Sequence, residues 1–300
     1  MKKFFSRNGV SIPSIGLGTW DLRHKEGEDV IKLAIEAGYR HIDTAQMYEN
    51  EEAVGNAIYN SNIARDKFFI TTKIYTLVIK NDEIDSSFNK SLQKLKTDYV
   101  DLLLIHFPAF TTNLDDMLAI LYKIKESSRV KNIGISNFNH NLVKDCIRLG
   151  YNDIFCNQVE YHPYLNQKKL ISIIKKSGIL PVAYSPLAKG ELLQEKLIID
   201  ISKKYSKTPA QIILRWLNQQ NWVAIPKSSN KKRLIENINI FDFTIDENDM
   251  NSLHKLNKNY RVVPSALGTF HQIDLPSKHT NKGLELIWIE RKIVFYCLYL

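Results

Sequence analysis

The stretch Gly16-Leu17-Gly18-Thr19-Trp20-Asp21 bears directly on which of two parallel α/β folds the chain adopts. A doubly wound sheet usually carries the motif G-x-G-x-x-G after its first strand. Here Asp21 stands where the third glycine belongs, although Asp43 lies at roughly the distance expected of the acid that accompanies the motif. The missing glycine argues against the doubly wound sheet and favours its competitor, a (β/α)8 barrel.

The rest of the chain repeats the pattern that such a barrel requires. Short apolar runs alternate with stretches in which apolar residues recur at spacings of three and four, as in Ile31, Ala34 and Ile35. The predicted strands are 15–20, 40–43, 68–73, 100–106, 132–136, 156–160, 180–185 and 222–226. The predicted helices are 27–37, 50–60, 82–96, 114–127, 139–149, 166–177, 194–219 and 230–238. Eight strand–helix units over about 240 residues fit a (β/α)8, or TIM, barrel in length and order.

Turn and capping residues mark the ends of several predicted elements. Gly38, Gly150 and Gly178 each follow a predicted helix, where a left-handed residue commonly ends the helix. Thr208-Pro209-Ala210-Gln211, inside 194–219, has the order of an N-cap, a first-turn proline and a capping-box glutamine. Asn8-Gly9 lies in the middle of segment 4–12, which predicts a β-hairpin that closes the bottom of the barrel.

The composition excludes several classes of protein. Apolar residues make up 44% of the 300 residues and charged residues 24%, so the bulk of the chain is not disordered, collagenous or coiled coil. We expect neither a membrane span nor a signal peptide, because no long uncharged apolar run is present. Cys146, Cys156 and Cys297 form no C-x-x-C pair, which is typical of a reducing cytoplasm. The net charge of +9 is spread over scattered lysines without a nucleic-acid-binding motif, so no nucleic-acid partner is expected.

Polar residues stand at the carboxyl ends of predicted strands two to eight, the edge where barrels of this kind place their active sites. Each of them alone has a structural explanation: Asp43 could cap a turn, Lys73 could be a solvated strand end, and His106 could be structural. Their convergence on one edge makes a functional site the better explanation. The residues are Asp43 with Tyr48, Lys73, His106, Ser136-Asn137, Gln158 to Glu160, Tyr184-Ser185 and Lys227-Ser228.

These strand ends and their flanks resemble the aldo-keto reductase family, close to its bacterial 2,5-diketo-D-gluconate (methylglyoxal) reductase branch. The matching segments occur in the family's order and spacing over about residues 3–265, and the combination is highly specific. The resemblance implies an NADPH-dependent barrel enzyme that reduces small aldehydes and keto compounds to alcohols. The segments include Gly38-Tyr39-Arg40-His41-Ile42-Asp43-Thr44-Ala45, Thr71-Thr72-Lys73, Ile133-Gly134-Ile135-Ser136-Asn137-Phe138, Asn157-Gln158-Val159-Glu160 and Ile225-Pro226-Lys227-Ser228.

The catalytic tetrad of that family corresponds to Asp43, Tyr48, Lys73 and His106. Reducing a carbonyl group requires a proton on oxygen and a hydride on carbon, and the hydride must come from a cofactor because no side chain supplies one. The resemblance assigns the proton to Tyr48, although a phenol with a pKa near about 10 is a weak acid. A neighbouring ammonium lowers such a pKa, so we expect Lys73 to act on Tyr48 while Asp43 keeps Lys73 charged. His106 would hydrogen-bond the carbonyl oxygen and orient it.

The resemblance also gives residues for the nicotinamide end of the cofactor. Ser136, Asn137 and Gln158 would bind the carboxamide. Tyr184, which could otherwise be a core residue, would stack on the nicotinamide ring. Ser185 and Leu187, which follow Tyr184, are predicted cofactor contacts as well.

The phosphate end of the cofactor corresponds to the start of the last predicted helix. Lys227, Ser228 and Arg233 would bind the 2′-phosphate, and the N-terminus of a helix favours phosphate. Two cations and a hydroxyl at this position favour NADPH over NADH. Glu236 and Asn237 complete the predicted contacts, with Asn237 beside the adenine.

Substrate contacts are predicted from Trp20 and Phe107, which would form the pocket wall together with Tyr48 and His106. Many relatives carry tryptophan at Phe107 and at Tyr75, so the identity of the substrate stays open. A non-catalytic NADPH-binding or sensing subunit of the same superfamily is the alternative function. A metal-dependent hydrolase would need an H-x-H, H-E-x-x-H or paired-acid cluster, which the sequence lacks, so no metal is expected.

We predict two parts of the chain, a barrel over 1–270 and an atypical C-terminal extension over 271–300. Relatives usually end soon after the stretch that matches 257–263. The last segment, 284–300, is apolar but too short and too charged for a membrane span. It could pack over the barrel, join two copies or have no selected role; by resemblance the protein is expected to be a cytoplasmic monomer.

Overall fold

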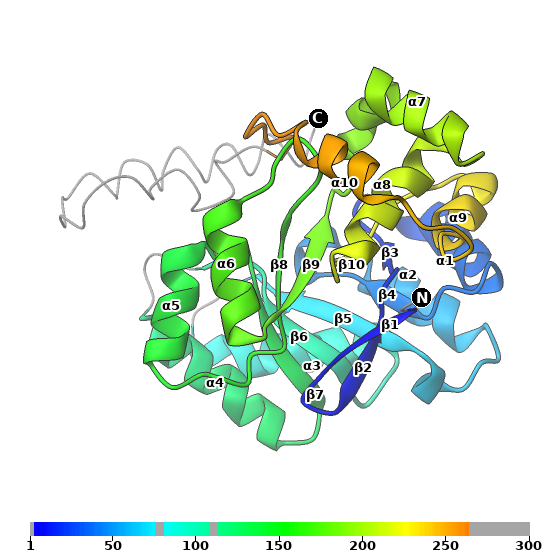
Figure 1. Cartoon of the computed structure of the whole chain (residues 1–300). Coiled ribbons are helices and arrows are strands. Elements are labelled where there is room, and N and C mark those ends of the chain that lie inside the picture. The colour runs from blue at the N-terminus through cyan, green and yellow to red at the C-terminus, as the bar shows by residue number, and fades with distance from the viewer. Residues whose placement is uncertain (1–2, 76–80, 109–112, 264–300) are drawn as a thin grey trace, which may run out of the picture.

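The computed structural model describes residues 3–75, 81–108 and 113–263, and it shows a curled eight-stranded sheet surrounded by helices (Figure 1). The predicted extension 271–300, with its apolar segment 284–300, lies outside the described residues. Within the described ranges, none of the helices has the length and apolar character needed to cross a membrane.

The strands of the sheet follow one another in sequence order, and each is parallel to its neighbours. All eight coincide with predicted strands, although the first and the last are shorter than 15–20 and 222–226. The strands are β3 (Leu17–Gly18), β4 (His41–Asp43), β5 (Phe69–Ile74), β6 (Val100–Ile105), β7 (Val130–Ser136), β8 (Cys156–Glu160), β9 (Leu180–Tyr184) and β10 (Val223–Ala224).

The sheet closes into a barrel where its first strand meets its last. Ile15 forms a parallel bridge with Ala224, and the N–H of Gly16 donates to the carbonyl oxygen of Ala224 at 2.9 Å. The two backbones approach so closely that a Cβ on Gly18 would lie 2.6 Å from the carbonyl oxygen of Ile225. Gly18 therefore permits barrel closure, whereas a Cβ on Gly16 would lie 2.5 Å from the His41 ring. The predicted (β/α)8 barrel is confirmed.

A β-hairpin of β1 (Phe4–Arg7) and β2 (Val10–Pro13) covers the end of the barrel at which the strands begin. Its turn has a φ of 51° at Asn8 and 77° at Gly9, and a two-residue type I′ hairpin turn needs positive values at both central residues. Phe5 and Ile12 belong to the apolar cluster inside the barrel, together with Phe69 at the start of β5. The predicted hairpin and its place at the bottom of the barrel are confirmed.

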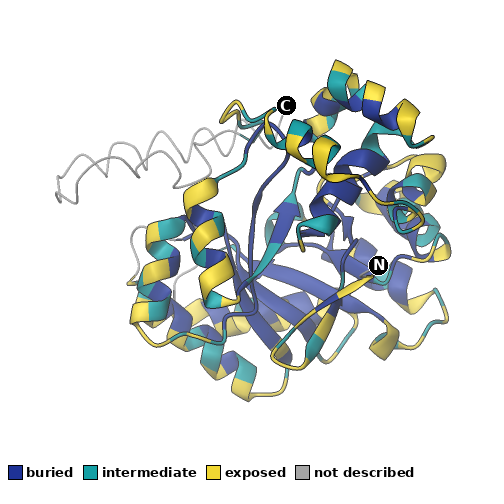
Figure 2. Cartoon of the chain, viewed as in Figure 1, coloured by how far each residue is buried: buried dark blue, intermediate teal, exposed yellow. Residues whose placement is uncertain are grey.

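The helices pack around the outside of the barrel, with buried faces toward the sheet and exposed faces toward solvent (Figure 2). Gly38, Gly150 and Gly178 follow helices with φ values of 103°, 96° and 67°, as predicted. The α-helices are α1 (His24–Glu36), α2 (Glu51–Tyr59), α3 (Ile84–Leu95), α4 (Leu114–Glu126), α5 (His140–Arg148), α6 (Lys168–Ser177), α7 (Lys196–Lys204), α8 (Pro209–Gln219), α9 (Lys231–Ile238) and α10 (Glu247–His254). Short 3-10 helices are η1 (Gln46–Tyr48), η2 (Arg65–Lys67), η3 (Asn81–Glu83) and η4 (Ala188–Gln194).

The prediction of one helix over 194–219 is wrong, because two helices, α7 and α8, occupy this segment. Between them Ser206 has a positive φ of 52°. Helix α8 begins with the predicted capping box, in which the Gln211 N–H donates to Thr208 Oγ1 at 3.3 Å and the Thr208 N–H donates to Gln211 Oε1 at 3.0 Å. A capping box requires non-helical backbone before it, so the two helices cannot be continuous. Helix α10 was not predicted.

Candidate active site

The predicted tetrad lies together at the carboxyl end of the barrel. Asp43 is the last residue of β4, Tyr48 ends η1, Lys73 lies near the end of β5, and His106 follows β6 directly. Lys73 Nζ donates to Asp43 Oδ1 at 2.5 Å, to the Thr44 carbonyl oxygen at 3.0 Å and to Tyr48 Oη at 3.2 Å. The Lys73 side chain is 0% exposed and that of Asp43 is 1% exposed, so this ion pair is shielded from solvent.

Electrostatics in this cluster differ in one respect from the sequence prediction. Burial raises the pKa of Tyr48, and this effect outweighs the Lys73 ammonium, which lowers it. The net direction is therefore opposite to the predicted one, although the contribution of Lys73 has the predicted sign. Burial lowers the pKa of Lys73, but Asp43 and then Tyr48 raise it by more, so its net pKa is raised and the ammonium form is favoured.

The environment of His106 favours its neutral form. Burial, and then the nearby Lys73 charge, hold the pKa of the imidazole well below its ordinary value. Its ring lies edge-on to Tyr48 with the centroids 5.5 Å apart. A neutral imidazole beside a phenol can donate a hydrogen bond without adding charge to the site.

A hydrogen-bonded network connects the tetrad to the residues predicted for the nicotinamide. Asp43 Oδ2 accepts from Gln158 Nε2 at 2.7 Å, and the Gln158 carbonyl oxygen accepts from Ser136 Oγ at 3.0 Å. Asn137 Nδ2 donates to the His106 carbonyl oxygen at 2.9 Å, and Tyr184 Oη donates to Asn137 Oδ1 at 2.8 Å. The structure thus brings Ser136, Asn137, Gln158 and Tyr184 to the tetrad, as expected of one continuous site.

The residues predicted for the phosphate lie after β10, at the same end of the barrel. Asn230 caps α9 by accepting the Arg233 N–H at 3.1 Å, so the guanidinium of Arg233 takes no part in the cap. Lys227 and Arg233 are exposed, and within the described residues neither has a carboxylate partner within ion-pair distance. Ser228 and Asn237 are buried. The remaining predicted contacts, Ser185, Leu187 and Glu236, are half-buried, the first two just after β9 and Glu236 in α9.

Aromatic rings surround Tyr48 and His106. Trp20 lies edge-on to Tyr48 at 5.0 Å, and Phe107 stacks on His106 at 4.5 Å. Tyr75 lies 6.4 Å from the His106 ring. Trp20 is 43% exposed, so it lies at the rim of this aromatic wall rather than in the core. The predicted substrate contacts Trp20 and Phe107 therefore flank the two polar groups.

One residue that positions the site was not predicted. Asn50 Oδ1 accepts from Thr44 Oγ1 at 2.7 Å, and Asn50 Nδ2 donates to the carbonyl oxygens of Thr19 and Leu22 at 2.7 and 3.0 Å. These bonds join the loop that carries Tyr48 to the loop that carries Trp20. The position of Asn50 two residues after Tyr48 is the only sequence signal, and it does not reveal partners about thirty residues earlier in the chain.

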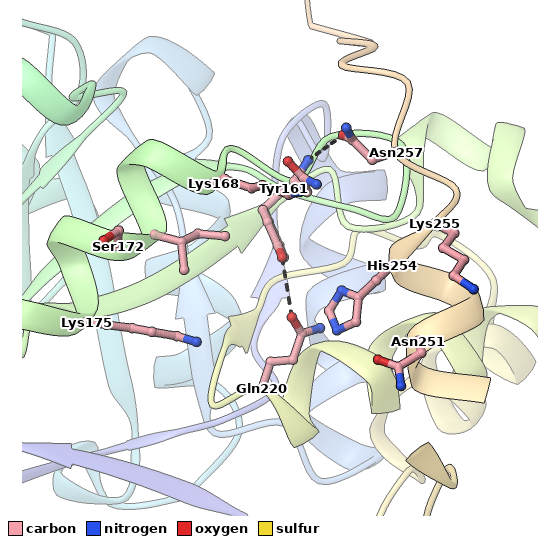
Figure 3. A pocket seen from close by; sticks show the side chains of 11 residues that line it. Tyr161, Lys168, Ser172, Lys175, Gln220, Asn251, His254, Lys255 and Asn257 are labelled. Atoms are coloured by element: carbon pink, nitrogen blue, oxygen red, sulfur yellow. Dashed lines mark hydrogen bonds between the residues drawn. The ribbon is translucent and has the colours of Figure 1, made fainter. Parts of the chain in front are cut away.

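A cavity of about 820 Å³ lies elsewhere, outside the barrel (Figure 3). Its walls come from α6, α10 and the end of α8, and none of the tetrad lines it. Its three lysines are exposed to solvent. The lining residues are Tyr161, Asn166, Lys168, Ile171, Ser172, Lys175, Gln220, Asn251, His254, Lys255 and Asn257.

No cluster of three or more histidine, cysteine, aspartate or glutamate side chains that could hold a metal ion occurs in the part of the chain that the structure describes. The cysteines there, Cys146 and Cys156, are buried, and burial raises the pKa of each thiol.

Comparison with known proteins defines the class to which this barrel and site belong. The model of the aldo/keto reductase family matches residues 14–258, and the chain is a member of that family. Its members are oxidoreductases that act on small carbonyl compounds and generally use nicotinamide cofactors.

Two bacterial relatives and one solved structure illustrate the similarity. The chain is 40% identical over 259 residues to glyoxal reductase of Bacillus subtilis (strain 168), covering 86% of this chain and 94% of that protein. It is 38% identical over 257 residues to methylglyoxal reductase DkgB of Escherichia coli O157:H7, covering 85% and 96%. The crystal structure of a putative 2,5-diketo-D-gluconic acid reductase B superposes with a TM-score of 0.84 at 35% identity, covering 93% of this chain and 98% of that one.

Proposed function

We propose that this protein is an NADPH-dependent reductase of small aldehydes and keto compounds such as methylglyoxal and 2,5-diketo-D-gluconate. The observation that carries the proposal is the buried Asp43–Lys73 pair with Lys73 Nζ 3.2 Å from Tyr48 Oη. The names of the relatives, a glyoxal reductase and a methylglyoxal reductase, support the substrate class.

Tyr48 is the proposed general acid, and its hydrogen bonds suit that role. Tyr48 Oη accepts from Lys73 Nζ, so its own hydrogen stays available for a carbonyl oxygen. Burial keeps the pKa of Tyr48 above its ordinary value, so the phenol carries its proton at neutral pH. As that proton moves to the substrate, negative charge grows on Oη next to the Lys73 ammonium, which stabilises it at close range.

Asp43 and His106 are proposed to position the groups on either side of Tyr48, the Lys73 ammonium and the substrate oxygen. Asp43 holds the ammonium of Lys73 by a direct ion pair, and it accepts from Gln158 with its second oxygen, so neither group can turn away. The neutral His106 imidazole is proposed to donate a hydrogen bond to the substrate oxygen and to hold it next to Tyr48.

The residues present fit a reduced nicotinamide cofactor with a 2′-phosphate. Lys227 and Arg233 offer two exposed cations without a carboxylate partner among the described residues, next to the buried Ser228. Ser136, Asn137, Gln158 and Tyr184 are proposed to hold the nicotinamide end, and Ser185, Leu187, Glu236 and Asn237 the rest. When bound, the cofactor supplies the hydride that no side chain can supply.

The test is NADPH oxidation, followed by its absorbance, with methylglyoxal and a panel of aldehydes. Tyr48→Phe should abolish turnover and leave NADPH binding within about twofold, because the substitution removes only the hydroxyl. Tyr59→Phe is the matched control, since Tyr59 is 70% exposed and should tolerate the change. Turnover by Tyr48→Phe would refute the acid assignment. Tight NADPH binding without any turnover by the unaltered protein would instead favour the cofactor-sensing subunit.

A further inference from the structure

Glu160 is a fully buried carboxylate at the rim of the barrel that the proposed reaction does not use. It is the last residue of β8, and its exposed fraction is 0%. Because side chains alternate along a strand, Glu160 lies on the same face of β8 as Gln158, which reaches Asp43 inside the barrel. In the neighbouring strand its register partner is Tyr184.

The groups that satisfy this carboxylate come mainly from a distant part of the chain. Glu160 Oε1 accepts from the backbone N–H of Val262 at 2.7 Å and lies 3.0 Å from His162 Nε2. Glu160 Oε2 accepts from the backbone N–H of Val263 at 3.3 Å and lies 3.7 Å from Arg261 Nη1. Three consecutive residues, 261–263, therefore each face the carboxylate of Glu160 with a donor group.

Residues 258–263, here called the strap, are fastened at their other end as well. The backbone N–H groups of Lys258 and Tyr260 donate to the carbonyl oxygen of Tyr164 at 3.0 and 3.1 Å. Tyr260 Oη donates to Glu191 Oε1 in η4 at 3.2 Å, and Arg261 Nη2 donates to Gln167 Oε1 at 3.1 Å. The strap thus joins the loop after β8 to the segment after β9.

The anchored end of the strap lies next to Tyr184, the residue proposed to stack on the nicotinamide. Burial is the main reason that the pKa of Tyr184 is raised; the Glu160 carboxylate raises it further, and the Arg261 guanidinium opposes this. Both charges of the anchor therefore act on Tyr184. The hydroxyl of Tyr184 donates to Asn137 Oδ1 at 2.8 Å. A movement of the strap that displaces Tyr184 would therefore also disturb Asn137 in the proposed nicotinamide site.

We propose that Glu160 is a positioning residue that anchors the strap across the rim of the barrel over β8 and β9 and thereby holds Tyr184 in place for the cofactor. The role in cofactor binding rests on the proposed function. A carboxylate suits this task because it accepts from several donors at once, whereas an amide of the same shape accepts at one atom only.

The experiment compares Glu160→Gln with the unaltered protein. The new amide NH2 would face donors from the strap, and losing one charge-assisted hydrogen bond should populate the open strap at least about tenfold more. Cleavage after Lys258 by a lysine-specific protease, identified by mass, should accelerate by the same factor because it follows the open population. The dissociation constant for NADPH should rise about tenfold, while kcat at saturating NADPH and substrate should stay near that of the unaltered protein.

Two further variants keep the test decisive. Tyr260→Phe removes the exposed hydrogen bond to Glu191, which water can replace, and should change cleavage and NADPH binding by less than about twofold. Arg261→Gln removes the guanidinium that faces Glu160 and leaves the buried carboxylate itself in place. It therefore tests the same anchor if Glu160→Gln fails to fold.

Unchanged cleavage after Lys258 in both anchor variants would show that Glu160 does not hold the strap. Faster cleavage with unchanged NADPH binding would overturn the positioning role. If the unaltered protein binds no NADPH, the proposed function fails and the cofactor role of the strap fails with it, while the cleavage rates still decide the anchoring.

Discussion

Asp43→Asn should destabilise the protein strongly at neutral pH and much less at alkaline pH. The substitution keeps the shape of the side chain but removes the charge that faces Lys73 Nζ at 2.5 Å. The Lys73 side chain is 0% exposed, so the ammonium loses its counter-charge in a place that water does not reach. Burial, which already lowers the pKa of Lys73, then acts with less opposition.

The magnitude follows from the expected change in the pKa of Lys73. Removing one partner of a buried ion pair costs about 3–5 kcal/mol. The same figure results if the pKa of Lys73 falls about three units below its value in the unfolded chain, at about 1.4 kcal/mol per unit. Both routes agree, so we expect the free energy of unfolding to fall by about 4 kcal/mol near neutral pH.

The sign of the pH dependence distinguishes this explanation from loss of packing. In the unaltered protein the pKa of Lys73 is raised, so the stability that the pair contributes is present below the unfolded-state pKa and is lost as pH rises through the folded-state pKa. In Asp43→Asn the folded-state pKa of Lys73 lies below the unfolded-state pKa. The penalty is then complete at low pH and disappears as pH rises toward about 10.4, the unfolded-state value.

Urea unfolding of both proteins at several pH values between about 7 and 9.5 measures the difference directly. We expect the difference in the free energy of unfolding to shrink as pH rises. Asp101→Asn is the matched control, because its partners Arg65 and Lys131 are 21% and 48% exposed and remain hydrated. A difference for Asp43→Asn that stays constant with pH would refute the assignment of the penalty to a buried, charged Lys73.

Two other substitutions test the cofactor site and the fold. Arg233→Ala should weaken NADPH binding about tenfold or more and NADH binding less than about twofold, as measured by fluorescence titration, because only NADPH carries the 2′-phosphate; equal weakening would reject the phosphate assignment. Thr208→Ala should lower the free energy of unfolding by about 1 kcal/mol in urea, because it removes the Oγ1 that accepts the Gln211 N–H of the capping box; no loss would mean that the cap is not needed once α8 is packed.

Much of the fold could be predicted because local patterns determine it. Several strands of the sheet contain short apolar runs. In β6 both faces are buried, the residues at 102 and 104 inside the barrel and those at 103 and 105 against the helices. The Asn8-Gly9 turn and the Thr208 cap depend on neighbours within a few residues. Helix α10 was missed because its sequence, ENDMNSLH, is mostly polar and only Leu253 is buried.

The candidate site was predictable in its positions and less so in its energetics. The end of a barrel strand is a position that the sequence reveals, and Asp43, Lys73 and His106 all occupy such ends. The direction of the Tyr48 pKa was wrong because it depends on burial, which arises only when separate segments meet. The same holds for the anchor at Glu160, whose partners at residues 262 and 263 carry no motif.

The closure between the first and last strands has a consequence for how the barrel assembles. This seam consists of the Ile15–Ala224 bridge with three backbone hydrogen bonds, Gly16 N–H to Ala224, Gly18 N–H to Pro226 and Ala224 N–H to Ser14. It joins segments from opposite ends of the barrel sequence, so the entropic cost of closing the loop is high, and we expect it to form after the sequential strand pairs during folding. Because the seam has few hydrogen bonds, we expect it to open locally before the other strand pairs. Amide hydrogens of the seam should therefore exchange fastest among those of the sheet, and those of β5 and β6 slowest.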